Sequence, residues 1–318
     1  MTRTLLIDTD TASDDAVALI MALRADDVHV AAITTVAGNV NVDQATRNAL
    51  YTVELCGALT PVFAGARQPL KRPYANATWF HGEDGLGDHG YPEPRAKPQH
   101  GHAVDAIIGA IHANPGIVLV TLGPLTNMAL AITKDPSIAH QVSRCVVMGG
   151  APCCEGNVTP AAEYNIWVDP DAARIVMRSG MPIELIGWHL CRGEAILNDR
   201  EIARILALNT PTARFTVECN SRAIEAIRIQ TGEQGISLPD PVAMGIAIDP
   251  SLVTLSSSHR VEIETDSDLT RGMTVVDRLN VARDARNQAE WADAMPAKVA
   301  WRMDVPKWKW QLFAALTI

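Results

Sequence analysis

The chain has 318 residues, of which 47% are hydrophobic and 20% are charged, so it contains enough apolar material for one large α/β domain or two smaller ones. Its net charge of -9 and its lack of a basic run argue against a nucleic-acid polymer as partner. No apolar stretch approaches the roughly 20 residues of a membrane span, so we expect no membrane partner.

The N-terminus enters a strand-like run within three residues and has no signal-peptide pattern. The six cysteines show neither a CxxC pair nor the spacing of a metal site. We therefore expect a cytoplasmic protein with reduced thiols.

Short runs rich in Val, Ile and Leu alternate with segments of helical periodicity. We expect strands at residues 4–8, 30–36, 117–122, 145–150 and 182–187. We expect helices at residues 14–25, 42–57, 103–113, 127–132, 170–180 and 241–248. This alternation predicts a single large α/β domain over residues 1–318, with a mainly parallel, Rossmann-like open sheet flanked by helices and a binding site at the carboxyl ends of the strands.

Residues 66–100 interrupt this alternation. The segment is rich in Pro, Gly and His and has no clear periodicity. Long loops inside compact domains are often functional, so we expect a mobile loop or lid over the site.

Four carboxylates lie in the stretch DTDTASDD, directly after the first expected strand: Asp8, Asp10, Asp14 and Asp15. One of them would suffice to cap the helix that follows, which is the simpler reading for Asp14 or Asp15. Four carboxylates repel one another unless a cation or a helix N-terminus offsets their charge. Hard divalent cations take oxygen ligands, so the cluster favours a metal site.

Polar residues also follow the other expected strands. Each one alone is typical of a turn or a helix cap. Together they would suit a ligand with several hydroxyls, and a sugar is the natural candidate. They are Asn39, Thr126, Asn127, Asn157, Glu163, Asn165 and Asp240.

Six segments, in this order, resemble the inosine-uridine preferring nucleoside hydrolases. They are DTDTASDDAVAL, AGNVNVDQATRNAL, HGEDGLGD, LGPLTNMALA, VVMGGAPCCEGNVTPAAEYNIWVDPDAA and LPDPVAM. The resemblance implies a calcium-dependent enzyme that cleaves the N-glycosidic bond of ribonucleosides to give ribose and free base. It also implies a homodimer or homotetramer.

Carried over by position, the resemblance makes three carboxylates and one backbone carbonyl the Ca²⁺ ligands: Asp10, Asp15, Asp240 and the carbonyl of Thr126. The same Asp10 would act as the base that takes a proton from a water on the calcium. The ribose 2′- and 3′-hydroxyls would bind Asp14, Asn165 and Asp240, with Asn39 and Met148 nearby. Asn157 and Glu163 would hold the 5′-hydroxyl.

The residue before the last calcium-binding aspartate departs from the family pattern. The best-known branch has a histidine there that protonates the leaving purine, whereas this chain has Pro239. Substitute donors are Trp79, Trp188, His81, His189, Cys153 and Cys154. We favour His81 as the catalytic residue because it lies in the expected lid, although it would equally serve the 5′-hydroxyl or the loop structure.

Two other functions remain open at this stage. The segment LLIDTDTA superficially resembles the Asp-x-Asp motif of haloacid dehalogenase-type phosphohydrolases, but the downstream Lys and acidic pair of that class are not evident. A non-catalytic nucleoside or ribose binding protein would explain the missing acid at Pro239. A complete set of calcium ligands argues against a mere binder, because binding alone needs no ionised water.

Overall fold

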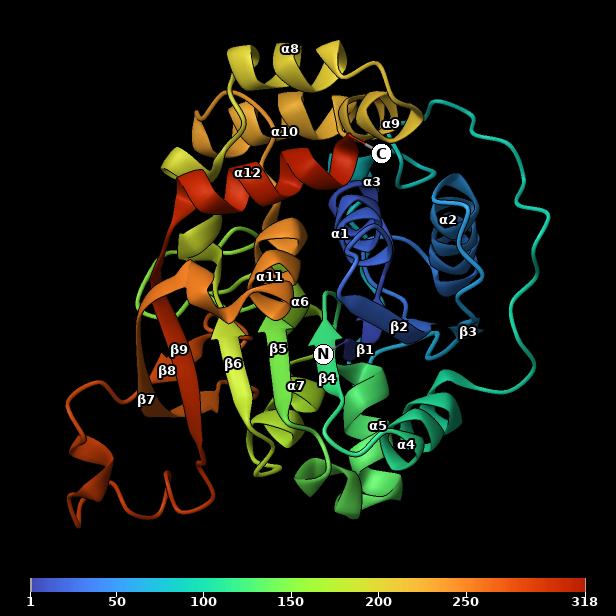
Figure 1. Cartoon of the computed structure of the whole chain (residues 1–318). Coiled ribbons are helices and arrows are strands. Elements are labelled where there is room, and N and C mark those ends of the chain that lie inside the picture. The colour runs from blue at the N-terminus through green and yellow to red at the C-terminus, as the bar shows by residue number, and fades with distance from the viewer. Residues whose placement is uncertain (1, 318) are drawn as a thin grey trace.

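A nine-stranded sheet forms the centre of the molecule in the computed structural model, which describes residues 2–317 (Figure 1). The strand order is β3-β2-β1-β4-β5-β6-β9-β7-β8. The strands are β1 (Arg3–Thr9), β2 (Val28–Thr35), β3 (Val62–Ala64), β4 (Val118–Thr121), β5 (Arg144–Met148), β6 (Ile183–Ile186), β7 (Val253–Ile263), β8 (Thr274–Val276) and β9 (Pro296–Met303). All pairings from β3 to β9 are parallel, whereas β7 runs antiparallel to both β9 and β8.

Twelve α-helices and five short 3₁₀ helices connect these strands in the described part of the chain. The α-helices are α1 (Ser13–Leu23), α2 (Val42–Leu55), α3 (Thr78–His81), α4 (Ala103–Ala113), α5 (Thr126–Lys134), α6 (Tyr164–Val168), α7 (Pro170–Met177), α8 (Asp199–Ala207), α9 (Pro211–Cys219), α10 (Ser221–Thr231), α11 (Pro239–Ile248) and α12 (Val305–Leu316). The 3₁₀ helices are η1 (Pro136–His140), η2 (Trp188–Cys191), η3 (Gly193–Ala195), η4 (Pro250–Leu252) and η5 (Val281–Arg283).

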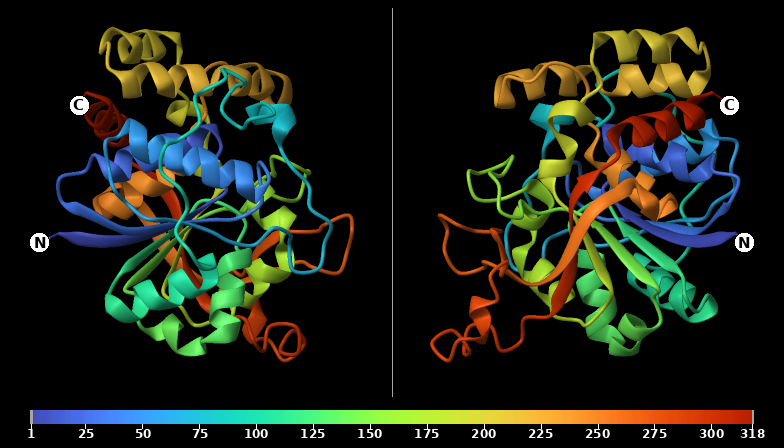
Figure 2. Two further views of the ribbon diagram at one scale, coloured as in Figure 1. Left: turned by 90° about the vertical axis from the view of Figure 1, so that its right-hand side faces the viewer. Right: turned by 60° about the vertical axis from the view of Figure 1, so that its left-hand side comes forward.

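Helices cover both faces of the sheet and create two apolar cores (Figure 2). On β1, Leu5 and Ile7 pack into the core beneath α1, α2 and α11, while Leu6 points into the core beneath α4, α5 and α7. This alternation follows from the two-residue period of a strand. A strand buried on both faces reads as a continuous apolar run, which is why TLLI signals β1 in the sequence.

The predicted α/β architecture is confirmed, because all five expected strands are present as β1, β2, β4, β5 and β6 and are parallel. Four strands were not expected. β3 and β8 have only three residues each, and β7 carries the polar run SSSH where an apolar strand signal would be needed. Within residues 2–317, no helix combines the length and the apolarity that crossing a lipid bilayer requires.

Residues 66–100 contain only the short helix α3 as regular structure. Several contacts attach the segment to the body of the protein: Leu86 is buried in the core, Asp88 pairs with Arg222 at 3.2 Å, and Glu93 pairs with Arg47 at 2.8 Å. Helix α3 packs against α10. The predicted mobility of this segment stays a prediction.

Candidate functional site

The acidic loop between β1 and α1 lies at the carboxyl edge of the sheet. It begins where β1 ends at Thr9, and α1 begins at Ser13. Asp15 closes the loop, because its carboxylate accepts hydrogen bonds from the Thr9 hydroxyl at 2.5 Å and from the Ala12 N–H at 3.0 Å. Asp15 therefore caps the first turn of α1, and capping does not explain Asp10 and Asp14.

Asp10 is held between two neighbouring strand-end loops. Its Oδ2 accepts the Asn39 N–H at 2.6 Å. A Cβ at Gly38 would lie 2.1 Å from Oδ2, and one at Gly123 would lie 2.8 Å from Oδ1. The glycines thus allow the backbone after β2 and β4 to approach the carboxylate closely, which fixes its position.

Three further carboxylates converge beside Asp10. One oxygen each of Asp14, Asp15 and Asp240 lies within 4.8 Å of the others. Asp240 reaches the cluster because α11 begins at Pro239 and packs alongside α1. A proline suits the first position of a helix, where its missing N–H is not needed.

Burial dominates the electrostatics of this cluster. It raises the pKa of Asp14 to about 7 and the pKa of Asp10 and Asp240 well above the usual range, and repulsion between the carboxylates adds to the effect. Burial also raises the pKa of Asp15, although the Thr9 and Ala12 hydrogen bonds oppose it. Burial and mutual repulsion therefore disfavour ionising the four groups together, and a cation among them would offset this effect.

The residues fit a divalent cation by the chemistry of their free atoms. Asp10 Oδ1 and Asp14 Oδ1 are buried and have no hydrogen-bond partner. Within residues 2–317, no Lys or Arg pairs with Asp10, Asp14, Asp15 or Asp240. Buried acceptors without donors or counter-charges are what an oxygen-liganded ion would satisfy.

Thr126 is the remaining metal ligand that the sequence predicts. It is the first residue of α5 and is buried, and its hydroxyl donates to Asp169 at 2.7 Å. That bond orients the residue at the end of β4, where the sheet edge carries the carboxylates. Coordination by its carbonyl stays a prediction.

A cavity opens above the cluster. Eight predicted site residues line it: Asp14, Asn39, His81, Met148, Asn157, Glu163, Asn165 and Asp240. The others, Asp10, Asp15 and Thr126, are buried and are not part of the lining.

Glu163 and Asn165 are fixed by the N-terminus of α6. The Glu163 carboxylate accepts the N–H groups of Asn165 at 2.9 Å and Gly150 at 2.8 Å, and burial raises its pKa to about 6. The Asn165 amide nitrogen donates to the Leu122 carbonyl at 2.7 Å, so this hydrogen bond already engages the nitrogen. Asn157 accepts the Tyr164 N–H at 2.9 Å, which links the loop to the same helix.

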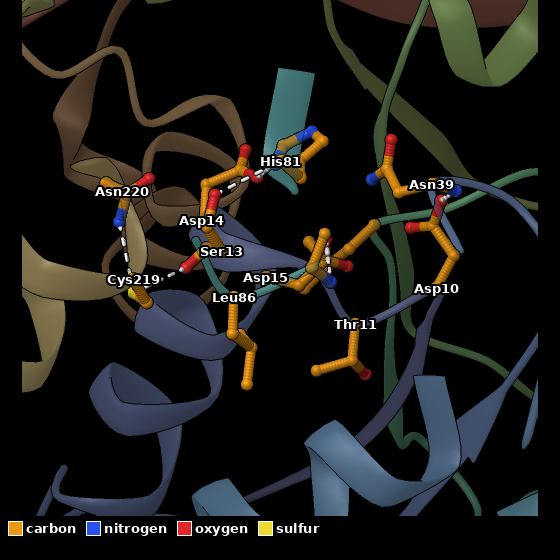
Figure 3. Close-up of polar contacts among 12 residues, drawn as sticks. Asp10, Thr11, Ser13, Asp14, Asp15, Asn39, His81, Leu86, Cys219 and Asn220 are labelled. Carbon is orange, nitrogen blue, oxygen red and sulfur yellow. Dashed lines mark hydrogen bonds and ion pairs between the residues drawn. The ribbon is translucent and has the colours of Figure 1, made fainter. Parts of the chain in front are cut away.

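His81 ends α3 and lines the cavity from the expected lid. Its Nδ1 lies 2.8 Å from the Ser13 hydroxyl and 3.9 Å from Asp14 Oδ1, as Figure 3 shows. Burial lowers the pKa of His81 to about 3, so the imidazole is neutral in this environment.

Comparison with known proteins decides what this arrangement of carboxylates and cavity is. Residues 5–309 match the family model described as inosine-uridine preferring nucleoside hydrolase. The chain belongs to this family. Its members hydrolyse the N-glycosidic bond of nucleosides, so the haloacid dehalogenase-type alternative is wrong.

Individual relatives agree with the family. The chain is 40% identical to a protein named pyrimidine-specific ribonucleoside hydrolase RihA of Photobacterium profundum, over 87% of this chain and 90% of the relative. It is 36% identical to a probable uridine nucleosidase 1 of Oryza sativa subsp. japonica, over 95% and 93%. Among solved structures, the plant nucleoside hydrolase PpNRh1 superposes with a TM-score of 0.94 at 32% identity, covering 100% of this chain and 99% of that one.

The candidates for a leaving-group donor in this nucleoside hydrolase differ in whether they line the cavity. Trp79, Trp188 and His81 line the cavity, and so does Pro239 itself. Cys153 lies at a different surface pocket, and His189 Nε2 donates to the Ala300 carbonyl at 3.0 Å. Burial raises the pKa of the Cys154 thiol to about 11, which makes it a poor acid.

Several residues of this nucleoside hydrolase cavity were not found from the sequence. They are Ala77, Phe80, Leu122, Val158, Tyr164, Asn220, Gln230 and Ser237. Asn220 and Gln230 come from the start and end of α10, a segment that carries no motif.

Proposed function

We propose that this chain is a Ca²⁺-dependent ribonucleoside hydrolase that uses water to release free base and ribose. The observation that carries the proposal is the group of buried carboxylates with unpartnered oxygens beneath a cavity lined by amides and carboxylates. An ion beneath the cavity would meet the hydroxyls of a bound sugar directly.

The ion would be held by Asp10, Asp15, Asp240 and the carbonyl of Thr126. A mixture of carboxylates and a carbonyl suits calcium, which tolerates irregular oxygen coordination better than magnesium does. When bound, calcium would lower the pKa of the attacking water and help to orient the ribose.

Asp10 would accept the proton of the attacking water. Its carboxylate is suited to this role because Gly38, Gly123 and the Asn39 N–H hold it in one position. A fixed base removes the cost of orienting it during the reaction.

Asp14, Asn165 and Asp240 would bind the 2′- and 3′-hydroxyls, with Asn39 and Met148 beside them. Asn157 and Glu163 would hold the 5′-hydroxyl. As the glycosidic bond breaks, positive charge develops on the ribose, and fixed carboxylates around the sugar would stabilise that charge.

Uridine is the substrate we propose first. Two relatives that are 36% to 40% identical bear the names of a uridine nucleosidase and of a pyrimidine-specific hydrolase. His81 would contact the leaving base or the 5′-hydroxyl from the lid, and the 66–100 segment would open to admit the nucleoside.

The assembly and compartment complete the proposal. We infer a homodimer or homotetramer from the family resemblance alone. A location in the cytoplasm is in keeping with six free cysteines. Sedimentation of the purified protein tests the assembly.

The deciding experiment incubates the protein with uridine, cytidine, inosine and guanosine and measures free base and reducing sugar, before and after chelation and after calcium is restored. We expect turnover that chelation abolishes and calcium restores. Asp240→Asn should abolish turnover, whereas Asp249→Asn should not, because Asp249 ends the same helix and pairs with Lys307 at 2.7 Å outside the cavity. Nucleoside binding without turnover would favour the non-catalytic alternative.

A further inference from the structure

The side-chain oxygen of Asn220 has no role in the metal and ribose contacts proposed above. Asn220 joins α9 to α10, is fully buried and lines the cavity. Its Oδ1 is buried and has no hydrogen-bond partner.

The orientation of the Asn220 amide is fixed by its neighbours. Its Nδ2 donates to the Thr216 carbonyl at 2.9 Å and lies 3.4 Å from Cys219 Sγ. A carbonyl oxygen accepts only, so the amide nitrogen must face Thr216 and Oδ1 must point the other way. Figure 3 shows the amide nitrogen directed towards Cys219 and Oδ1 pointing away from it. The cavity wall therefore contains an acceptor that cannot turn into a donor.

An acceptor of this kind is costly unless something donates to it. Leaving a buried acceptor unpaired costs about 1–3 kcal/mol, so a cavity residue of this kind calls for an explanation. Within residues 2–317, no side chain or N–H group supplies the missing donor.

The surroundings of Asn220 indicate which part of a ligand supplies it. Helix α3, which packs against α10, brings Phe80 to the cavity, and the apolar side chains of Trp188 and Pro239 also line it. Flat and apolar surfaces suit a heterocyclic base, whereas the carboxylates of the strand-end loops suit hydroxyls.

We propose that Asn220 Oδ1 accepts a hydrogen bond from a ring N–H of the bound base, the imide N3–H in the case of uracil. The inference rests on the ribonucleoside hydrolysis proposed above and makes Asn220 a specificity-determining residue. A base that presents no donor at this position leaves the acceptor unpaired and is cleaved more slowly.

Two methylated nucleosides test this in the unmodified protein. Both 3-methyluridine and 5-methyluridine add one methyl group to uridine, but only the first removes the N3–H donor. We expect kcat/KM for 3-methyluridine to be about 5- to 100-fold below that for 5-methyluridine, the range that corresponds to an unpaired buried acceptor. Equal values for the two would overturn the inference.

The variant Asn220→Leu assigns the effect to this residue, because it keeps a similar volume and removes the acceptor. We expect kcat/KM for uridine to fall and the gap between the two methylated nucleosides to close. Turnover of p-nitrophenyl riboside, which has no ring N–H, should stay within about twofold of the unmodified protein, and this also shows that the variant folds. A parallel loss on uridine and on the riboside would mean a contact to the sugar or a structural role, and would overturn the inference.

The two proposals fail in different ways. Cleavage of p-nitrophenyl riboside without discrimination against 3-methyluridine would remove the role of Asn220 and leave ribonucleoside hydrolysis intact. No cleavage of the riboside or of any nucleoside in the presence of calcium would overturn the proposed function, and this inference with it.

Discussion

The hydroxyl of Ser13 lies 2.8 Å from Nδ1 of His81, and both side chains are buried. This contact joins the acidic loop after β1 to the segment expected to act as a lid. If the hydroxyl donates to Nδ1, the neutral imidazole carries its hydrogen on Nε2 and offers the cavity a hydrogen-bond donor. The first prediction rests on this tautomer.

Removing this hydroxyl should release the imidazole. We expect Ser13→Ala to lower kcat/KM for uridine by about fivefold, the loss for one hydrogen bond of about 1 kcal/mol. Nitrogen NMR of the imidazole should report the Nε2–H tautomer in the unmodified protein and a mixture in the variant. Ser221→Ala is the matched control, because that hydroxyl bonds His89 at 2.9 Å and Ser221 does not line the cavity. An unchanged tautomer in Ser13→Ala would contradict the role given to Ser13.

The stability of the protein without bound metal, prepared with a chelator, should fall as the pH rises. Burial raises the pKa of Asp8 and of Asp14 from 3.8 to about 7. A carboxyl with a higher pKa in the folded state binds more protons when folded, so its contribution to stability is present below pH about 4 and is lost as the pH rises through about 7. Calcium should offset the charges that form over this range.

Thermal unfolding measured from pH 5 to pH 8, with calcium and with chelator, checks this prediction. The gain in Tm on adding calcium should be larger at pH 8 than at pH 5. Asp14→Asn should flatten the pH dependence of the chelated protein. A calcium effect that is the same at both pH values would rule out the proposed compensation of charge.

A change at Gly38 should disturb Asp10 without replacing any residue of the acidic loop between β1 and α1. An alanine Cβ there would lie 2.1 Å from Asp10 Oδ2, so either the carboxylate or the loop must move. We expect Gly38→Ala to lower kcat by at least about 100-fold, because small misplacements of catalytic groups cost that much. Gly109→Ala is the control, since nothing lies within 4 Å of its added Cβ. Equal kcat values for the two variants would show that the position of Asp10 is not critical.

The sequence predicts those parts of this protein in which a residue pattern is compatible with only one kind of structure or ligand. The run TLLI identifies β1 because only a strand buried on both faces is continuously apolar, and crowded carboxylates such as Asp14 and Asp15 leave few alternatives to a cation. Asn220 and Ser13 carry no such signal. Asn and Ser occur in caps and turns throughout proteins, so the residue type alone does not indicate a role in a site. The role of Ser13 depends on its contact with His81, which lies 68 residues away in the sequence.

Deoxyribonucleosides should be much poorer substrates than ribonucleosides. Asp14 Oδ1 is a buried acceptor without a partner, and the 2′-hydroxyl is the ligand group proposed to satisfy it and its neighbours. A site built to bind a hydroxyl rejects its absence by several kcal/mol. Steady-state kinetics with uridine and 2′-deoxyuridine measure this directly, and similar kcat/KM values would refute the placement of the ribose.

The last prediction follows from Pro239, which lines the cavity but has no proton to give. Cleavage must then depend on the leaving group itself or on a hydrogen bond from the lid. A p-nitrophenolate leaving group needs no protonation, so p-nitrophenyl riboside should be cleaved well even if inosine is cleaved slowly. The gap should exceed the roughly 10²- to 10⁴-fold that general acid catalysis supplies.

His81→Ala then separates the two roles of the histidine. If His81 assists the departing base through its Nε2–H, the variant should depress inosine cleavage far more than cleavage of the riboside. If it binds the 5′-hydroxyl or only supports α3, both substrates should suffer alike, since both carry the same sugar. Fast and equal turnover of inosine and the riboside by the unmodified protein would mean that another group activates the base, and Trp79 and Trp188, which also line the cavity, would be the next residues to change.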